Sequence, residues 1–226
     1  MEKIFITTSD GVKIAANLYE VKPRRVEEWL VLVHMMPATK ESWDFLAKSF
    51  QAIGYESIAI DLRGHGESSG GPGGFNDFSD TEHKKSILDI EAAVDYLIEN
   101  KNVLPDRISF IGASIGANLS LKYVSENKNF KTAALLSSGL NYRGIETEQL
   151  VKNLASGQRI LFVSSRDDIR SGGNNNAEEN QKLYELAPED VEKKIQIYET
   201  GGHGTDILKN QRDLLNLIIE FIKANK

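Results

Sequence analysis

The sequence predicts an α/β fold in which a mostly parallel sheet of eight strands carries helices on both faces. Past an opening pair of strands, short apolar segments alternate with longer amphipathic ones along the whole chain. Strands joined by helices pair in parallel, so this alternation favours a parallel sheet. Segments such as 29–34 (WLVLVH) are apolar without interruption, as expected for strands buried on both faces. The length of 226 residues fits a single domain over 1–226.

The individual elements follow from periodicity and from turn-forming residues. Ser9-Asp10-Gly11 is a turn sequence and predicts an antiparallel hairpin of the segments on either side of it. Apolar residues at helical spacing predict a first helix over 42–53, with Ser42 as its N-cap and Gly54 as its stop. Strands are expected over 3–8, 13–20, 29–34, 55–62, 107–113, 131–137, 159–164 and 194–198. Further helices are expected over 80–100, 115–126, 147–154, 176–186 and 205–223.

Composition and charge exclude several classes of function. The 27 basic and 33 acidic residues give a net charge of -6 and form no basic stripe, so we expect no nucleic-acid partner. The chain has no cysteine, which rules out disulfides, thiolate metal sites and a cysteine nucleophile. Neither a signal peptide nor an apolar run of roughly 18 residues is visible, so we expect a cytoplasmic protein without membrane association. The sequence leaves open whether this protein is a monomer or a homodimer.

Two further classes of site are not expected. No cluster of His, Asp and Glu has the spacing of metal ligands, so neither a metal nor another cofactor is predicted. The glycine-rich segment 63–74 lacks the Gly-Lys-Ser/Thr ending of a phosphate-binding loop, which argues against nucleotide binding. This segment and 171–176 (SGGNNN) both follow predicted strands. Ligands bind beyond the carboxyl ends of parallel strands, so both loops are expected to border the site.

One motif indicates chemistry. Gly112-Ala113-Ser114-Ile115-Gly116 lies between a predicted strand and a predicted helix. A G-x-S-x-G sequence in that context holds a serine hydroxyl out on a sharp turn, where it reaches a substrate. The glycines two residues before and after the serine let the strand and the helix approach closely. The alternative is a tight turn in which Ser114 only caps the helix.

With this motif the chain resembles the α/β-hydrolase family, in particular its serine esterases and dienelactone hydrolases with a minimal cap or none. In that family the nucleophile is followed by an acid after a later strand and by a histidine after the last strand. Asp167-Asp168 follows the strand over 159–164, and His203 follows the strand over 194–198. The resemblance therefore implies a catalytic triad.

The implied triad is Ser114, Asp168 and His203. Histidine has the pKa of a base that can take the serine proton, and the carboxylate would orient the imidazole and stabilise its charged form. Asp168 is preferred to Asp167 because the family's acid often lies three residues after the small residue that ends the strand, here Ser165. Asp167 remains the alternative acid.

The other three histidines receive structural interpretations. His34 ends a strand and is expected to be buried and hydrogen-bonded. His65 lies in 61–68, which resembles the family's D-x-R-G-x-G-x-S loop, so it is expected to shape that loop. His83 stands beside two lysines and is expected to be solvated.

The resemblance also implies an oxyanion hole of two backbone N–H groups. One is the N–H of Ile115, after the nucleophile and at a helix N-terminus, where the dipole favours negative charge. The other is assigned by position to Met36, because Pro37 has no N–H. Met35 stands where the family usually has glycine and would be strained at a positive φ. Met35 and Met36 either fill the core or provide an apolar wall for the acyl group.

The predicted substrate is a small, soluble carboxylic ester, cleaved through an acyl-enzyme on Ser114 as in a carboxylesterase. At most a short cap segment is expected around 139–157, which leaves the site open. Met35, Tyr142 and Arg143 are the candidate pocket residues. Arg143 could bind a substrate carboxylate, as in a dienelactone-type hydrolase, although arginine more often lies on the surface in a salt bridge. Thioesterase and amidase activity need the same triad, and a non-catalytic binding protein with this fold is the alternative outside the enzymes.

Overall fold

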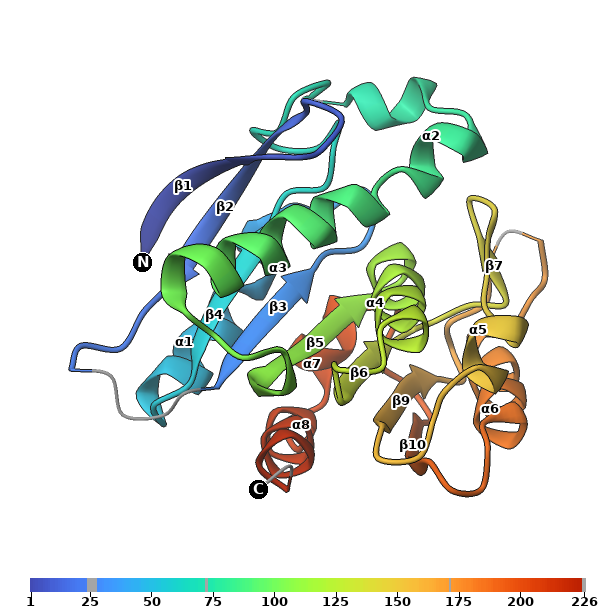
Figure 1. Ribbon diagram of the computed structural model, residues 1–226. Coiled ribbons are helices and arrows are strands. Elements are labelled where there is room, and N and C mark those ends of the chain that lie inside the picture. The colour runs from blue at the N-terminus through green and yellow to red at the C-terminus, as the bar shows by residue number, and fades with distance from the viewer. Residues whose placement is uncertain (24–27, 72, 171, 225–226) are drawn as a thin grey trace.

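The computed structural model describes residues 1–23, 28–71, 73–170 and 172–224. In these residues the main sheet has eight strands in the order β1-β2-β4-β3-β5-β6-β9-β10 (Figure 1). β2 is antiparallel to both β1 and β4, and the other neighbouring strands pair in parallel. The strands are β1 (Glu2–Thr7), β2 (Lys13–Tyr19), β3 (Trp29–Val33), β4 (Glu56–Ile60), β5 (Ile108–Ala113), β6 (Thr132–Leu136), β9 (Arg159–Ser165) and β10 (Glu192–Tyr198). The predicted fold, a mostly parallel sheet with an N-terminal antiparallel hairpin, is confirmed.

Helices cover both faces of this sheet, as predicted (Figure 1). One face carries α1, α7 and α8, and the other carries α3, α4 and α6. The helices are α1 (Asp44–Ala52), α2 (Asp80–Lys84), α3 (Ile87–Lys101), α4 (Ile115–Glu126), α5 (Glu148–Lys152), α6 (Asn176–Leu186), α7 (Thr205–Asn210) and α8 (Leu214–Lys223). A small hairpin of β7 (Asn141–Tyr142) and β8 (Ile145–Glu146) lies between β6 and α5.

β3 shows why the central strands are apolar at every position. Trp29, Val31 and Val33 belong to the core on the side of α3 and α4. Leu30 and Leu32 belong to the core on the side of α1 and α8. Because successive side chains of a strand point to opposite faces, a strand between two helical layers needs apolar residues throughout.

Two predicted helices are each divided in two. The N–H groups of Lys85 and Ser86 donate to carbonyls three residues back, so the chain tightens into a 3₁₀ turn between α2 and α3. Gln211 takes an extended conformation, with φ -117° and ψ 107°, and therefore ends α7 before α8 begins. Apolar spacing continues across Gln211, from Ile207 to Leu214 and Ile218, whereas residues 80–86 have no apolar residue that could mark a break; the sequence therefore predicted one helix in each place.

The start of α1 also differs from the prediction. The chain first makes a 3₁₀ turn over Lys40–Trp43, and Ser42 Oγ donates to the carbonyl of Thr39 at 2.7 Å. Ser42 therefore lies inside this turn instead of capping α1, which begins at Asp44. Gly54 does follow the helix with a φ of 96°, the conformation that favours glycine after a helix end.

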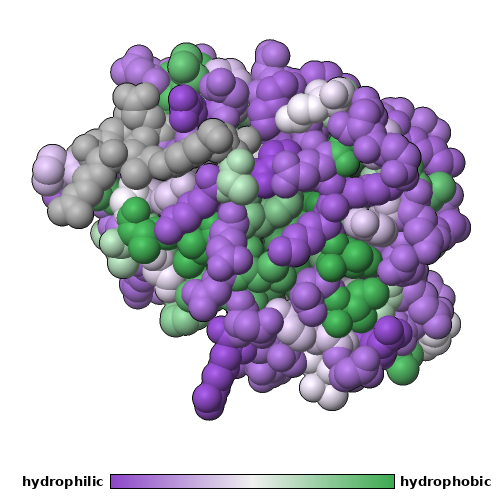
Figure 2. All heavy atoms as spheres, turned by 90° about the horizontal axis from the view of Figure 1, so that it is seen from below, coloured by the Kyte–Doolittle hydropathy of each residue, from purple (hydrophilic) through white to green (hydrophobic). Residues whose placement is uncertain are grey.

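The surface is largely polar. Figure 2 shows the molecule from below, with hydrophilic side chains over most of this face and smaller apolar areas between them. The most exposed large apolar side chains beyond Met1, namely Phe45, Leu104 and Ile169, come from separate elements. Within the described residues, no helix combines the length and apolar character needed to cross a bilayer.

Candidate active site

Ser114 is the single residue between β5 and α4, so it lies on a very sharp turn. Its φ of 56° and ψ of -120° are rare for a residue with a side chain. A Cβ atom on Gly112 would lie 2.2 Å from the carbonyl oxygen of Gly116, and one on Gly116 would lie 2.3 Å from that of Val33. Both glycines of the motif are therefore needed for the strand and the helix to approach.

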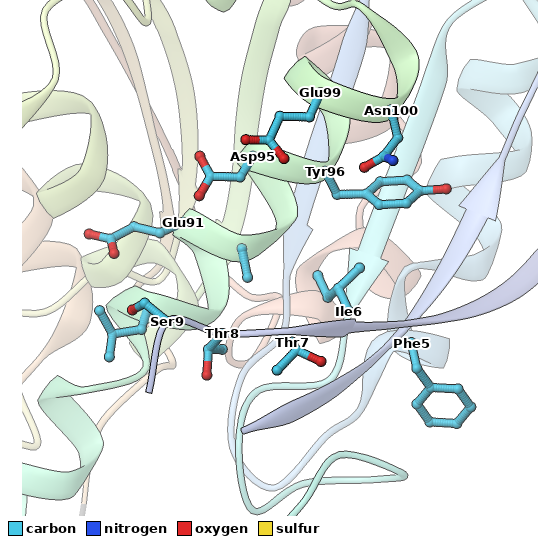
Figure 3. A pocket seen from close by; sticks show the side chains of 12 residues that line it. Phe5, Ile6, Thr7, Thr8, Ser9, Glu91, Asp95, Tyr96, Glu99 and Asn100 are labelled. Carbon is cyan, nitrogen blue, oxygen red and sulfur yellow. The ribbon is translucent and has the colours of Figure 1, made fainter. Parts of the chain in front are cut away.

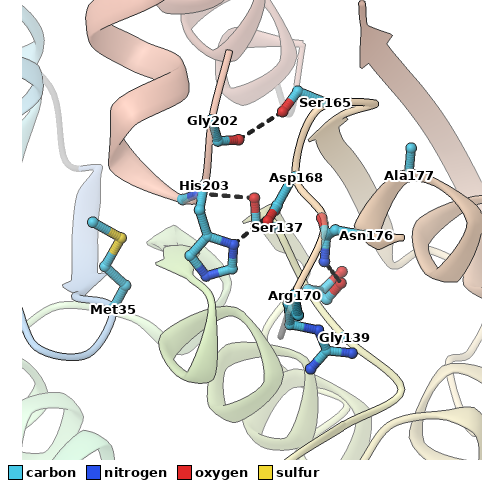
Figure 4. A network of polar contacts seen from close by, with 12 residues as sticks. Met35, Ser137, Gly139, Ser165, Asp168, Arg170, Asn176, Ala177, Gly202 and His203 are labelled. Atoms are coloured by element: carbon cyan, nitrogen blue, oxygen red, sulfur yellow. Dashed lines mark hydrogen bonds and ion pairs between the residues drawn. The ribbon is translucent and has the colours of Figure 1, made fainter. Parts of the chain in front are cut away.

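His203 and Asp168 are in direct contact. His203 Nδ1 lies 2.7 Å from Asp168 Oδ2, as Figure 4 shows. Asp168 is buried, whereas Asp167 is exposed and accepts hydrogen bonds from the N–H groups of Gly201 and Gly202, each at 3.1 Å. A hydrogen bond from Ser165, and those from the two glycines, lower the pKa of Asp167. The structure thus brings together His203 and Asp168, the preferred acid, whereas Asp167 binds the backbone of the loop that carries His203.

The loop that carries His203 is held on both sides of the ring. Ser165 Oγ donates to the carbonyl of Gly202 at 2.6 Å, and the N–H of Gly204 donates to Ser137 Oγ at 2.8 Å (Figure 4). Gly204 has a φ of 58°, and a Cβ atom there would lie 2.6 Å from Met35 Sδ. These contacts fix the imidazole beside the end of β9.

The two expected oxyanion donors come from two segments, the start of α4 directly after Ser114 and the loop after β3. Ile115 is the first residue of α4, and Met36 follows β3, which pairs with β5. Neither of these N–H groups donates a hydrogen bond to another residue in the described part of the chain. Met35 does not have a positive φ, so the strain considered for it does not arise. Its sulfur lies 3.8 Å from Thr205 Oγ1, beside the histidine loop.

The other two candidate pocket residues lie on the small hairpin and have different surroundings. Tyr142 is half-buried, and its ring centroid lies 6.2 Å from that of His203, edge to face. Burial raises the pKa of the Tyr142 hydroxyl. Arg143 is exposed at the turn of the hairpin, where a Cβ atom on Gly144 would touch Lys84 of α2. Tyr142 therefore lies beside His203, while Arg143 is exposed at the outer end of the hairpin.

The sequence matches a known family model. The match covers residues 24–166, well over half of the chain, and the model is described as serine aminopeptidase, S33. The chain belongs to this family of α/β-hydrolases. No protein among those with curated function matches the sequence.

Solved structures of similar fold include esterases. DcsB, solved in complex with its substrate analogue, has a TM-score of 0.81 and 16% identity, over 99% of this chain and 98% of that one. An esterase from Pyrococcus furiosus has a TM-score of 0.78 and 18% identity, over 99% and 89% of the two chains. An esterase from Exiguobacterium antarcticum has a TM-score of 0.75 and 14% identity, over 98% and 100%. At these identities the likeness establishes the fold that this hydrolase shares with them.

Two of the other histidines of the hydrolase have the structural roles predicted for them. His34 is fully buried, with Nδ1 at 2.8 Å from the carbonyl of Met35 and Nε2 accepting from the N–H of Leu62 at 3.0 Å. Burial lowers the pKa of His34 to about 3. His65 is buried in the loop after β4 and stacks on Phe75, with ring centroids 4.0 Å apart.

The prediction for His83 is wrong. Its side chain is 1% exposed and lies edge-on to Phe78, with ring centroids 5.5 Å apart. Burial is the main cause that lowers its pKa. The neighbouring Lys84 and Lys85 are exposed, but a helix turns by about 100° per residue, so adjacent side chains face different surroundings.

Sequence reasoning missed four polar residues around Tyr142. Asn118, Asn176 and Glu179 are buried, and Arg170 is partly exposed. Asn176 Nδ2 donates to the Tyr142 hydroxyl at 3.2 Å, at the end of the loop 171–176, in which Ser171 lies outside the described residues. The available signal was Asn118 within α4 and Asn176 and Asn180 within α6, because asparagine is a weak helix former and a buried amide needs hydrogen-bond partners.

A groove of about 420 Å³ lies away from these residues, between the β1–β2 hairpin and α3 (Figure 3). Carboxylates of α3 line one side of it, from Glu91, Asp95 and Glu99, and Phe5 of β1 lines another. It includes none of the candidate catalytic residues. No group of three or more His, Asp or Glu in the described residues is arranged to hold a metal ion.

Proposed function

We propose that this chain is a serine hydrolase that cleaves small, soluble carboxylic esters through an acyl-enzyme on Ser114. The observation that carries the proposal is the 2.7 Å contact between His203 Nδ1 and Asp168. A carboxylate on Nδ1 selects the tautomer in which Nε2 is free to accept a proton. Ser114, on the kind of strand-to-helix turn that presents a nucleophile to substrate, is the proton donor that this arrangement would serve.

The reaction is a two-step acyl transfer. Ser114 Oγ attacks the ester carbonyl carbon while its proton passes to His203. The tetrahedral intermediate then loses its alcohol, which receives that proton from His203. Water, deprotonated in turn by His203, attacks the acyl-enzyme and releases the acid. The negative charge of both intermediates rests on oxygen held by the N–H groups of Ile115 and Met36, which are free of other partners in the described residues.

The substrate class follows from what surrounds the nucleophile. The segment around 139–157 holds only the β7–β8 hairpin and α5, and we propose that it is the short cap of a single domain over 1–226. Met35 lies against the loop that carries His203, Tyr142 lies beside the His203 ring, and Arg143 lies further out on the hairpin. A cap of this size favours small acyl groups over long lipid chains. The fold shared with two esterases supports the choice of an ester.

Cleavage of an amide is the second candidate. The matched family model is described as serine aminopeptidase, which favours the bond between an N-terminal amino acid and its neighbour. The same nucleophile, base and oxyanion donors serve both bonds, so the leaving group decides between them.

The test is a panel of p-nitrophenyl esters of increasing acyl length together with amino-acid p-nitroanilides. We expect turnover that falls with acyl length, and a loss of at least about 10⁴-fold in kcat for Ser114→Ala. Ser120→Ala is the matched control, because Ser120 is buried on the same helix and donates within it to the carbonyl of Gly116. Faster turnover of the anilides than of the esters would make an amide the substrate class. Binding without turnover would indicate a non-catalytic protein.

A further inference from the structure

Tyr142 approaches Ser114 from the same side as the general base. In the sheet β5 lies between β3 and β6, with β9 and β10 beyond β6. Tyr142 follows β6, Asp168 follows β9 and His203 follows β10, so these three residues lie on one side of the nucleophile. Met36 follows β3 and lies on the other side. Tyr142 is therefore opposite the oxyanion donor and next to the histidine.

The Tyr142 ring is held in place on several sides. The Arg170 guanidinium lies over it at 4.6 Å from the ring centroid, and Glu179 accepts from Arg170 at 2.6 Å. A Cβ atom on Gly139 would lie 2.7 Å from the ring, so the chain can pass there only as glycine. These contacts hold the Tyr142 ring in one position, which a side chain that only shields the site from solvent does not require.

The Tyr142 hydroxyl has a dedicated partner. Asn176 Nδ2 donates to it at 3.2 Å and also to the carbonyl of Ser138 at 2.8 Å. Asn176 is fully buried, and its side-chain oxygen Oδ1 accepts from Asn180 Nδ2 at 3.0 Å. Buried amides are stable only when they are hydrogen-bonded, so this network positions the phenol oxygen.

The contact with Asn176 leaves the Tyr142 hydroxyl available as a hydrogen-bond donor. The phenol oxygen accepts from Asn176, so its O–H remains available to donate to a group bound beside His203. Burial raises the pKa of Tyr142, which keeps this proton on the phenol at neutral pH. An alcohol leaving group must lie beside His203 to receive its proton, and the Tyr142 ring is packed edge to face against that histidine.

We propose that Tyr142 donates a hydrogen bond to the leaving-group oxygen of the ester while the acyl-enzyme forms. The proposal rests on the hydrolase function given above. In this step the bond between the carbonyl carbon and the alcohol oxygen breaks, and its electron pair passes to the oxygen. His203 transfers its proton to that oxygen, and Tyr142 keeps its own proton while it stabilises the growing charge.

This role selects a class of substrate. An alkoxide is a strong base and carries nearly a full charge as it leaves, whereas a nitrophenolate delocalises that charge into its ring. A donor on the leaving oxygen therefore matters most for esters of aliphatic alcohols. The substrates that fit are small esters of unactivated alcohols.

The experiment compares ethyl acetate with p-nitrophenyl acetate, which form the same acetyl-enzyme. For Tyr142→Phe we expect kcat/KM to fall about 10- to 100-fold on ethyl acetate and less than about 3-fold on p-nitrophenyl acetate, as for loss of one hydrogen bond to a developing charge. Asn176→Ala, which removes the positioning amide, is expected to show the same dependence on the leaving group. Tyr184→Phe is the matched control, because Tyr184 is a half-buried tyrosine of α6 with its ring against Lys193.

Three results would overturn the proposal. An equal loss on both esters for Tyr142→Phe would assign the residue a structural role only, and a gain on both would make it a group that obstructs Ser114. A loss of kcat/KM on ethyl acetate of the same size for Tyr184→Phe would show that the effect is not specific to Tyr142. Failure of the hydrolase function itself is distinguishable, because either the wild type would then turn over neither ester or Ser114→Ala would retain the wild-type rate on both.

Discussion

His203 Nδ1 contacts Asp168 at 2.7 Å, while the adjacent Asp167 turns away and accepts from the backbone of Gly201 and Gly202. Two neighbouring carboxylates thus have separate tasks, one on the imidazole and one on the loop that carries it. The two side chains point in different directions, so that Asp168 is buried and Asp167 is exposed.

Asp168→Asn should reduce kcat by about 10⁴-fold, the typical cost when the residue on Nδ1 no longer fixes the tautomer of a catalytic histidine. Asp167→Asn should reduce kcat by less than about 10-fold, because the amide oxygen can still accept from one N–H of the loop. Steady-state rates on p-nitrophenyl acetate, with thermal unfolding of both variants as the folding control, decide this. A greater loss for Asp167→Asn would make Asp167 the triad acid.

Gly116→Ala should destabilise the protein by at least about 2 kcal/mol, the order of cost for overpacking. Alanine normally stabilises a helix relative to glycine by up to about 1 kcal/mol, but here its Cβ would lie 2.3 Å from the carbonyl oxygen of Val33. Gly172→Ala is the control, since no atom lies within 4 Å of the Cβ position there. Urea unfolding gives the free energies, and an unchanged or higher stability of Gly116→Ala would mean that the close approach at the turn is incorrect.

His34 should make stability depend on pH. Burial lowers its pKa from 6.5 to about 3, so the folded state holds it neutral while the unfolded state takes up a proton below pH 6.5. Its contribution to stability is therefore fully present above pH 6.5 and is lost as the pH falls toward 3. The unfolding free energy of His34→Gln should consequently be lower at pH 7 and fall less between pH 6.5 and pH 4. Identical slopes for variant and wild type would show that His34 does not titrate as inferred.

Asn118→Leu should destabilise the protein by about 3 kcal/mol and also lower activity. Asn118 donates to the carbonyls of Gly139 and Ile145 and accepts from the N–H of Gly139, all at 3.0 Å, so leucine would leave these buried backbone groups unpaired. The hairpin that carries Tyr142 would lose its attachment to α4. Ser120→Ala on the same helix should change stability by less than about 1 kcal/mol. Similar unfolding midpoints for the two variants would contradict this account.

The sequence predicted correctly those features that depend on residues close together in the chain. The α4 helix over 115–126 and the α6 helix over 176–186 have the predicted bounds, because apolar spacing and capping residues act within a few turns. The turn at Ser114 was predictable because the residues that permit it, Gly112 and Gly116, lie within the same five positions. The helix breaks after Lys84 and at Gln211 were not, because residues 80–86 have no apolar pattern to interrupt and the apolar pattern of 207–222 continues through Gln211.

The sequence by itself therefore determined the strand and helix order, the family and the nucleophile turn. Only the tertiary structure decided that His83 is buried, that Asp168 and not Asp167 contacts His203, and that Tyr142 meets both Asn176 and His203. These contacts join the ends of β6, β9 and β10 with the start of α6, segments that are separated by many residues in the chain. Periodicity reports which way a side chain faces on its own element, whereas the packing of the sheet and its helices determines what it meets.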